Sequence, residues 1–315
     1  HFGMSTFDGN EISWGTKPST FYNPTALDAD QWVQVARDAG MKYAVLTAKH
    51  VSGHCLWPSR HTDYHVGTSS VTRDVVDAFV KACEKRGVLP GLYYCSWDNH
   101  HTFGSRTPSM TDWDKAYTTC EYRDFQLRQV EELLTQYGKL DEVWIDIPSL
   151  LGADGRRKQY HQIATLQPEA VVMMNHGFGD GSKLNYNHVW PTDLMAIERW
   201  MPSSNRGYNP WHSISHGSRA VDDGQPVQSA REPAEPEDHY IPGEVCDPIG
   251  YDWFFHPRDT LRSDEELLGM RLLCRSRRAN LLLDVPPDKT GRLPEPTVAA
   301  LMRLRRNLDR LGIQD

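Results

Sequence analysis

The stretch Asp141-Glu142-Val143-Trp144-Ile145-Asp146 decides how this chain is expected to fold. Its three consecutive apolar residues are too few for a helix, and a short apolar run of this kind is typical of a buried parallel strand. The run ends on a carboxylate, Asp146, and Pro148 then ends the strand because proline cannot donate to a ladder. A strand that ends on an acidic residue beside a tryptophan indicates a site for carbohydrate, although Asp146 could also serve only as a cap for the following turn.

Similar runs recur along the chain and alternate with helical patterns about every 30 to 45 residues, which indicates parallel βα units. The expected strands are the tail of a first strand at 1–7, followed by 43–48, 88–95, 143–146, 170–175, 193–198, 244–253 and 280–285. The expected helices are 28–39, 74–86, 113–137, 157–166, 263–277 and 294–311. Eight such units predict an α/β protein, a closed (β/α)8 barrel of TIM type.

The barrel is expected to form one catalytic domain over residues 1–315, with a long loop at 202–242 that is rich in Gly, Pro and Ser. No glycine-rich phosphate loop follows the first strand, which disfavours an open dinucleotide-binding sheet. Because the chain begins at His1 without a methionine, we expect that the N-terminal part of a longer protein is missing.

Composition excludes several classes of partner. The 315 residues carry a net charge of −8 and no long basic run, which argues against nucleic acid. No apolar run approaches the roughly 20 residues that a membrane span needs. The six cysteines are scattered without a CxxC pair, and no His-x-His closes the first strand, so neither a metal nor another cofactor is expected. The sequence leaves disulfides open.

The polar and aromatic residues at the expected strand ends could carry chemistry, because barrel enzymes place their sites there. They are His1, His50, Trp97, Asp146, Asn175, Glu198, Glu244 and Asp284. Two carboxylates that flank a sugar are the usual apparatus of glycosidases, and aromatic rings stack on the apolar faces of sugars. Any single histidine could be a bystander, and Glu244 could be structural in an ion pair.

Several motifs built on these residues resemble the α-L-fucosidases of glycoside hydrolase family 29 over essentially the whole chain. The matching segments are His1–Phe7, Asn23-Pro24 with Trp32 and Ala39–Tyr43, Leu46–Ser59, Gly91–Tyr94 with Trp97-Asp98, Val143–Asp146, Asp193–Glu198, Gly243–Asp247 with Trp253–His256, and Asn280–Pro287.

The resemblance implies a retaining exo-α-L-fucosidase that acts on a fucosylated oligosaccharide or glycoconjugate. It assigns the nucleophile to Asp146 and the acid/base to Glu198, with Glu244 as the reserve candidate. Residues implied to bind the sugar are His1, His50, Tyr94, Trp144, Asn175, Glu244 and Trp253. The opening motif and the Trp253–His256 segment are more similar to the subfamily selective for α-1,3 and α-1,4-linked fucose, as in Lewis-type glycans. The resemblance also favours a secreted or periplasmic location.

The chain departs from the family pattern after Lys49-His50, where Val51 replaces a second histidine. A hydroxyl partner for the sugar is therefore missing or supplied by another residue such as His54. Two further hypotheses stay open: a barrel that binds fucose without catalysis, and a retaining glycosidase for another sugar such as an α-galactoside.

Overall fold

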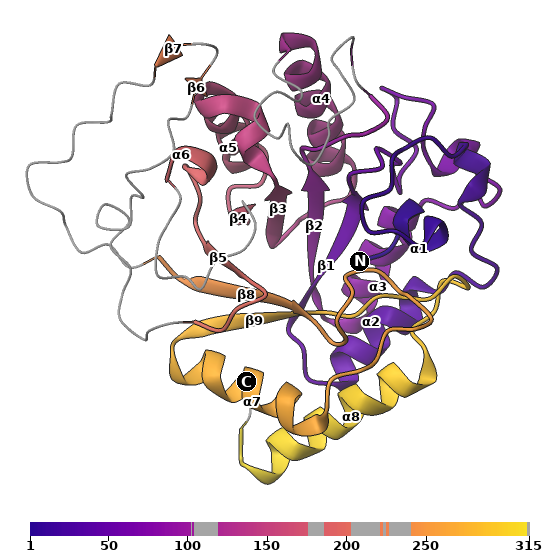
Figure 1. The fold of residues 1–315 in the computed structure, drawn as a ribbon, viewed down its shortest axis with the longest axis vertical. Coiled ribbons are helices and arrows are strands. Elements are labelled where there is room, and N and C mark those ends of the chain that lie inside the picture. Colours follow the sequence, from indigo (N-terminus) through magenta and orange to yellow (C-terminus); the bar gives the residue numbers. More distant parts are fainter. Residues whose placement is uncertain are drawn as a thin grey trace, which may run out of the picture.

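The computed structural model describes residues 1–101, 103, 119–175, 186–202, 221–222, 225–226 and 241–313. Parallel strands stand at the centre of this part of the chain, with helices outside them (Figure 1). One sheet has the order β1 (Tyr43–Lys49), β2 (Leu89–Cys95), β3 (Glu142–Asp146), β4 (Val171–Asn175). The other has the order β5 (Met195–Glu198), β8 (Gly243–Pro248), β9 (Ala279–Asp284).

The two sheets adjoin between β4 and β5, because the backbone N–H of Asp193 donates to the carbonyl of Val172 at 2.9 Å. Seven expected strands are thus confirmed, and the architecture is that of a (β/α)8 barrel domain. The expected loop at 202–242 lies almost wholly outside the described residues. Within it, β6 (Val221–Asp222) and β7 (Gln225–Pro226) form a short antiparallel pair.

The first expected element differs. Residues 1–7 were predicted to be the tail of a strand, but Met4–Asp8 forms the short helix α1, which ends at Gly9 in the left-handed conformation. Gly3 has a φ of 146°, which a side chain rarely allows, and this turn directs the chain away from the strand direction. Only His1 and Phe2 precede the turn. The apolar run of this segment instead buries its side chains as the inner face of a helix.

The helices follow the predicted pattern closely. They are α2 (Ala29–Asp38), α3 (Val75–Arg86), α4 (Cys120–Gln136), α5 (Gly152–Leu166), α7 (Asp264–Ser276) and α8 (Glu295–Arg310), and the short helix α6 (Tyr186–Val189) was not predicted. Asp28 caps α2 by accepting from the backbone of Gln31, and Ser263 with Glu266 forms the predicted capping box of α7. The start of the helix expected at 113–137 lies outside the described residues, and α5 begins earlier than predicted.

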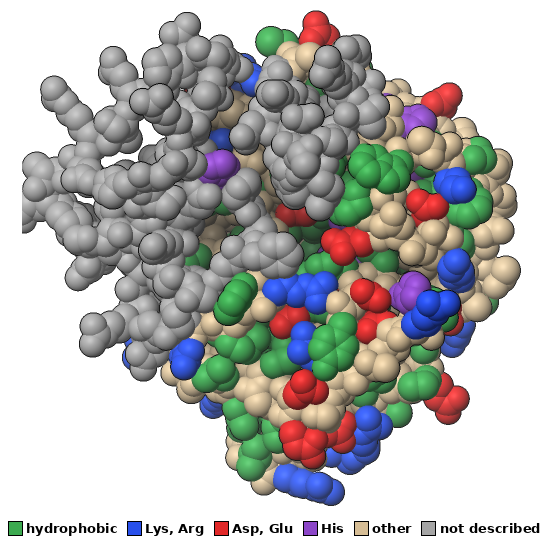
Figure 2. Space-filling model, in the orientation of Figure 1, with side chains coloured by type: hydrophobic (Ala, Val, Ile, Leu, Met, Phe, Trp, Pro, Cys, Tyr) green, Lys and Arg blue, Asp and Glu red, His purple; other side chains and the backbone are tan. Residues whose placement is uncertain are grey.

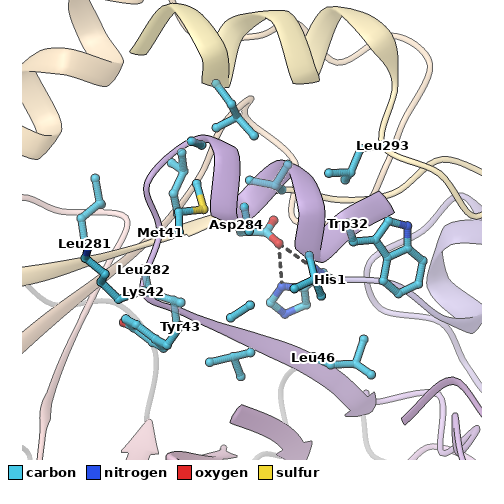
Figure 3. A pocket seen from close by; sticks show the side chains of 18 of the residues that line it. His1, Trp32, Met41, Lys42, Tyr43, Leu46, Leu281, Leu282, Asp284 and Leu293 are labelled. Atoms are coloured by element: carbon cyan, nitrogen blue, oxygen red, sulfur yellow. Dashed lines mark hydrogen bonds and ion pairs between the residues drawn. The ribbon is translucent and has the colours of Figure 1, made fainter. Parts of the chain in front are cut away.

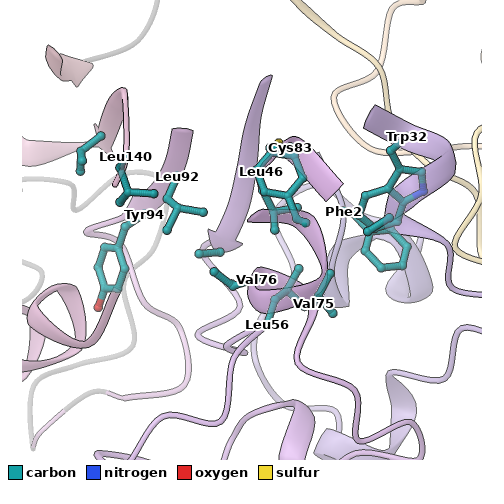
Figure 4. Close-up of a cluster of buried hydrophobic side chains, with 14 of the residues drawn as sticks. Phe2, Trp32, Leu46, Leu56, Val75, Val76, Cys83, Leu92, Tyr94 and Leu140 are labelled. Carbon is teal, nitrogen blue, oxygen red and sulfur yellow. The ribbon is translucent and has the colours of Figure 1, made fainter. Parts of the chain in front are cut away.

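Alternate residues of the strands enter two separate apolar clusters. Leu92 and Tyr94 of β2 belong to the large cluster between the strands and the outer helices, part of which Figure 4 shows. Tyr93 and Cys95 of the same strand belong to a smaller cluster inside the barrel. Because successive side chains of a strand point to opposite faces, strand parity decides which residues can reach the barrel interior.

A buried ion pair joins the last residue of β1 to the loop that follows β2. The ammonium of Lys49 lies 3.0 Å from Asp98, and both side chains are 0% exposed. Lys49 also donates to the carbonyl of Cys95 at 2.9 Å, while Asp98 accepts from the ring of His101 and from its backbone. Hydrogen bonds to both charges offset the cost of removing them from water. The pair thereby holds His50, the neighbour of Lys49, at a fixed place.

We predict that Lys49→Met lowers the free energy of unfolding by about 3–5 kcal/mol, because it leaves the Asp98 carboxylate buried without its cation. Urea denaturation followed by circular dichroism measures the change. Lys81→Met is the matched control, since Lys81 forms an exposed pair with Asp77 and its loss should have little effect. Similar midpoints for the two variants would contradict this role of the buried pair.

Candidate functional site

The parallel register aligns three polar side chains at the carboxyl edge of the first sheet. Asp146 of β3 pairs with Cys95 of β2 on one side and with Asn175 of β4 on the other. Strand partners in register project to the same face, so all three meet inside the barrel. Asp146 accepts hydrogen bonds from the hydroxyl of Tyr93 at 2.5 Å, the amide of Asn175 at 2.8 Å and the backbone N–H of Ile147 at 3.0 Å.

Glu198, the last residue of β5, reaches the same place from the second sheet. Asn175 Nδ2 donates to Glu198 Oε2 at 2.9 Å as well as to Asp146 Oδ1 at 2.8 Å. Since both oxygens lie within hydrogen-bond distance of one nitrogen, they can be no more than about 6 Å apart. Retaining glycosidases place their two carboxyl groups about 5–5.5 Å apart. The geometry therefore brings together the two carboxylates that the sequence singled out.

The two carboxyl groups differ in the groups that surround them. Burial, and then the charge of Asp146, raise the pKa of Glu198 to about 7, while Asn175 opposes the rise. Burial raises the pKa of Asp146 above its usual value, and the hydrogen bonds from Tyr93, Asn175 and Ile147 limit this rise. Donors that point at a carboxylate stabilise its charged form. Glu198 is thus suited to hold a proton near neutral pH, and Asp146 is suited to stay charged.

Aromatic rings form a wall beside Asp146. The ring of His1 lies 5.3 Å from Tyr93, 5.6 Å from Trp253 and 5.1 Å from Phe254. The ring of His50 lies 5.9 Å from Tyr93 and 4.8 Å from Phe254. His1 is oriented by Asp284, whose carboxylate lies 3.1 Å from its Nδ1. Such a wall offers apolar faces and a few polar atoms to one small ligand.

His50 has an unused polar atom in this wall. Its Nδ1 is buried and has no hydrogen-bond partner among the described residues. Burial, and then the charge of Lys49, lower the pKa of His50 to about 3, so the ring is neutral and can donate through one nitrogen and accept through the other. An unpaired buried polar atom is costly. A hydroxyl group of a ligand would satisfy it.

The structure separates two neighbouring tyrosines. Tyr94, expected at the site, points out of the barrel and donates to Gln129 of α4 at 2.8 Å. Tyr93, which the sequence reasoning passed over, points inward and donates to Asp146. Strand parity carried the missing signal, because Tyr93 pairs with Trp144, which shares a face with Asp146.

Trp144 and Glu244 lie one layer deeper in the barrel than Asp146. Trp144 stacks on Tyr93 at 5.4 Å and donates through Nε1 to Glu244 Oε1 at 3.2 Å. Glu244 also accepts from Tyr43 and Asn280. Glu142 is its buried neighbour, and burial followed by the charge of Glu244 raises the pKa of Glu142 well above its usual value. Among the described residues, Glu244 is thus connected to Asp146 through the stacked rings of Trp144 and Tyr93.

His54, the suggested substitute for the missing histidine, lies in the packing of the loop. Its Nε2 lies 3.1 Å from the hydroxyl of Ser19 and 3.0 Å from that of Ser69, and its ring packs against Tyr22 and Tyr64. These neighbours are loop residues, and none belongs to the aromatic wall. The structure therefore gives His54 a local packing role.

A cavity in the described part of the chain lies beside the carboxylates, and neither Asp146 nor Glu198 lines it. It measures about 300 Å³ and lies between β1 and β9, each of which ends its sheet (Figure 3). Apolar side chains such as Leu46, Leu281 and Leu293 make up much of its lining, and polar residues such as Lys42, Asn280 and Arg305 also line it. Because neither Asp146 nor Glu198 lines this gap between two strand edges, the cavity does not locate the reaction.

Two other properties of the described residues bear on partners. They contain no group of three or more His, Cys, Asp and Glu side chains placed to hold a metal ion. Within the described ranges, no helix is both long and apolar enough to cross a membrane. All six cysteines are free thiols in the structure.

The electrostatic interaction between Asp146 and Glu198 can be tested directly. We predict that Asp146→Asn lowers the pKa of Glu198 from about 7, because the variant removes a negative charge but keeps the side-chain volume. The pKa should stay above the usual value for glutamate, since burial is the larger cause. Carboxyl ¹³C NMR titration measures it, and an unchanged pKa would show that the two groups do not interact.

Comparisons with known proteins show similarity over nearly the whole chain. A family model described as alpha-L-fucosidase matches residues 4–312. Alpha-L-fucosidase 1 of Arabidopsis thaliana is 31% identical over 96% of this chain and 55% of that protein. The chain therefore spans about half the length of the curated relatives that it matches.

Solved structures show the same similarity. Alpha-L-fucosidase isoenzyme 1 from Paenibacillus thiaminolyticus superimposes with a TM-score of 0.71 at 26% identity, over 92% of this chain and 65% of that one. A glycoside hydrolase 29 family member from an unknown rumen bacterium gives a TM-score of 0.74 at 25% identity, over 97% of this chain and 53% of that one. On the match to the family model and the identity to the plant enzyme, the chain belongs to the alpha-L-fucosidase family, glycoside hydrolase family 29.

Proposed function

We propose that this barrel is the catalytic domain of a retaining exo-α-L-fucosidase that releases terminal fucose from glycans. The observation that carries the proposal is the single amide nitrogen of Asn175, which binds Asp146 and Glu198 at once. An upper limit of about 6 Å between the two oxygens supports a double displacement, because inverting glycosidases separate their carboxyl groups by about 6.5–9.5 Å to make room for a water molecule.

Asp146 is the proposed nucleophile. Its carboxylate attacks the anomeric carbon, and the bond from that carbon to the leaving oxygen breaks. Glu198 donates its proton to the leaving oxygen in this step. Water then attacks the glycosyl-enzyme, Glu198 accepts a proton from the water, and the bond to Asp146 breaks. A pKa of about 7 suits Glu198 to both halves of this cycle at neutral pH.

The aromatic wall suits the sugar itself. Fucose is a deoxy sugar with a methyl group, so part of its surface is apolar and packs well on aromatic rings. His1, Trp253 and Phe254 supply such rings beside Asp146. The unpaired Nδ1 of His50 is proposed to bind one of the hydroxyl groups. Trp144 and Glu244 are proposed to support Tyr93 from below.

We further propose selectivity for α-1,3 and α-1,4-linked fucose, which the opening motif at His1 and the Trp253–His256 segment support. The same set of carboxyl groups would serve another retaining glycosidase, such as one that acts on α-galactosides. A barrel that binds fucose without turnover is the remaining alternative, and the elevated pKa of Glu198 beside a charged Asp146 speaks against it.

The decisive experiment compares fucose release from a Lewis-type trisaccharide and from an aryl α-L-fucoside. Wild type should release fucose with retained configuration, and Asp146→Asn should lower kcat by at least about 10³-fold on both substrates because it removes the nucleophile. Reaction NMR measures both the rate and the configuration of the first product. Inversion, or full activity of the variant, would contradict the mechanism. Binding of fucose without turnover would favour the binding barrel.

The hydrogen bond from Tyr93 gives a second prediction with a matched control. Tyr93→Phe should lower kcat about 10–100-fold, because Asp146 loses a short hydrogen bond that fixes its orientation and charge. Tyr94→Phe removes the same atom from the next residue, on the opposite face of β2, and should leave kcat nearly unchanged. Steady-state kinetics on the aryl fucoside measures both variants. Equal losses would show that neither hydroxyl acts specifically on the site.

A further inference from the structure

The residues that follow Glu198 leave the barrel by an unusual route. Arg199 adopts a left-handed φ of 61°, and its backbone N–H donates to the carbonyl of Cys246 at 3.2 Å. This conformation is uncommon outside glycine and is retained where the surrounding contacts require it. The turn ends β5 abruptly. The next side chain, Trp200, is 57% exposed, more than any other large apolar side chain among the described residues.

Arg199 binds the segment that carries the aromatic wall. Its guanidinium lies 4.5 Å above the ring of Trp253 and donates to the carbonyl of Tyr251 at 2.6 Å. The hydrogen bond to Tyr251 uses one of the five N–H groups of the guanidinium. Acidic groups lie nearby, since the charge of Arg199 opposes the rise in pKa of both Glu198 and Glu11. The cation is therefore held in place beside the group that protonates the leaving oxygen.

Tyr251 is a second exposed aromatic residue, and it too is held firmly. Its side chain is 49% exposed although Arg262 lies 4.8 Å from the ring, and its backbone N–H donates to Asp259 at 3.0 Å. Arg262 is in turn fixed by Asp247 at 2.9 Å. A fixed aromatic surface loses little entropy when a ligand binds. Figure 2 shows hydrophobic side chains beside basic and acidic ones on the described part of this face.

We propose that Arg199, Trp200 and Tyr251 form the binding subsite for the sugar residues that leave with the oxygen atom protonated by Glu198. This inference rests on the proposed function and adds a site for the leaving group. The oxygen that accepts the proton belongs to the departing sugar, so that sugar must lie next to Glu198. Trp200 is two residues further along, within about 7 Å of backbone. The occupant is a neutral oligosaccharide of at least two sugar residues.

Each residue has a distinct role in this subsite. Trp200 offers a flat apolar face for the C–H groups of the first departing sugar. Arg199 donates its remaining N–H groups to hydroxyl oxygens of that sugar, and hydrogen bonds from a charged donor are the stronger kind. Tyr251, whose backbone Arg199 holds, offers the face for the next sugar. An aryl fucoside has no sugar in its leaving group and makes none of these contacts.

The test uses this difference between substrates. Trp200→Ala should lower kcat/KM for a Lewis-type trisaccharide about fivefold to tenfold and leave kcat/KM for an aryl α-L-fucoside within about twofold. Trp200→Phe should restore most of the loss. Leu311→Ala is the control, since Leu311 is equally exposed at 55% but follows α8, whose end lies away from the carboxyl ends of the strands.

A binding measurement separates recognition from packing. The disaccharide that remains after fucose is removed should inhibit hydrolysis of the aryl fucoside, and both Trp200→Ala and Arg199→Met should weaken this inhibition several-fold. Equal losses on both substrates, or inhibition that no variant changes, would overturn the subsite. Failure of the proposed function looks different, because wild type would then release no fucose from either substrate.

Discussion

Two carboxyl groups share one hydrogen-bond donor at the carboxyl edge of this barrel, and the rest of the site depends on that arrangement. The amide of Asn175 can reach both Asp146 and Glu198 only because β3 and β4 pair in parallel and in register, and because β5 approaches β4 from the second sheet. A shift of one residue in either pairing would turn one of these side chains toward the helices. Strand register is therefore the constraint from which the chemistry follows.

The carboxyl groups of Asp146 and Glu198 differ in their hydrogen-bonding environments, and these environments affect their pKa values. Both are buried, which by itself raises both pKa values. Asp146 receives three short hydrogen bonds and Glu198 receives one from the same donor, Asn175. The charge that these donors keep on Asp146 then acts on Glu198 and favours its protonated form. Two identical functional groups are thus distinguished by a difference in hydrogen bonding.

Much of this arrangement could be predicted from the sequence. The strand that ends at Asp146, the helix caps at Asp28 and Ser263, and seven of the strands follow from local patterns that tertiary contacts do not override. The choice between Tyr93 and Tyr94 required the register of β2 against β3, which a single sequence does not state. The helix at Met4–Asp8 was missed because its short apolar run fits a strand equally well until the turn at Gly3 is known.

The position of a residue along the barrel axis is the property that is hardest to predict from the sequence. The side chains of Glu244 and Glu198 both point into the barrel. The register pairs Ala196 with Glu244 and Glu198 with Cys246. The two carboxylates therefore lie two residues apart along the strand direction. Because of this offset, Glu244 accepts hydrogen bonds from Tyr43, Trp144 and Asn280. The ring of Trp144 in turn stacks on Tyr93. The hydroxyl of Tyr93 then reaches Asp146. Glu244, which the sequence offers as a reserve candidate for the acid, thus supports the Trp144 ring that stacks on Tyr93.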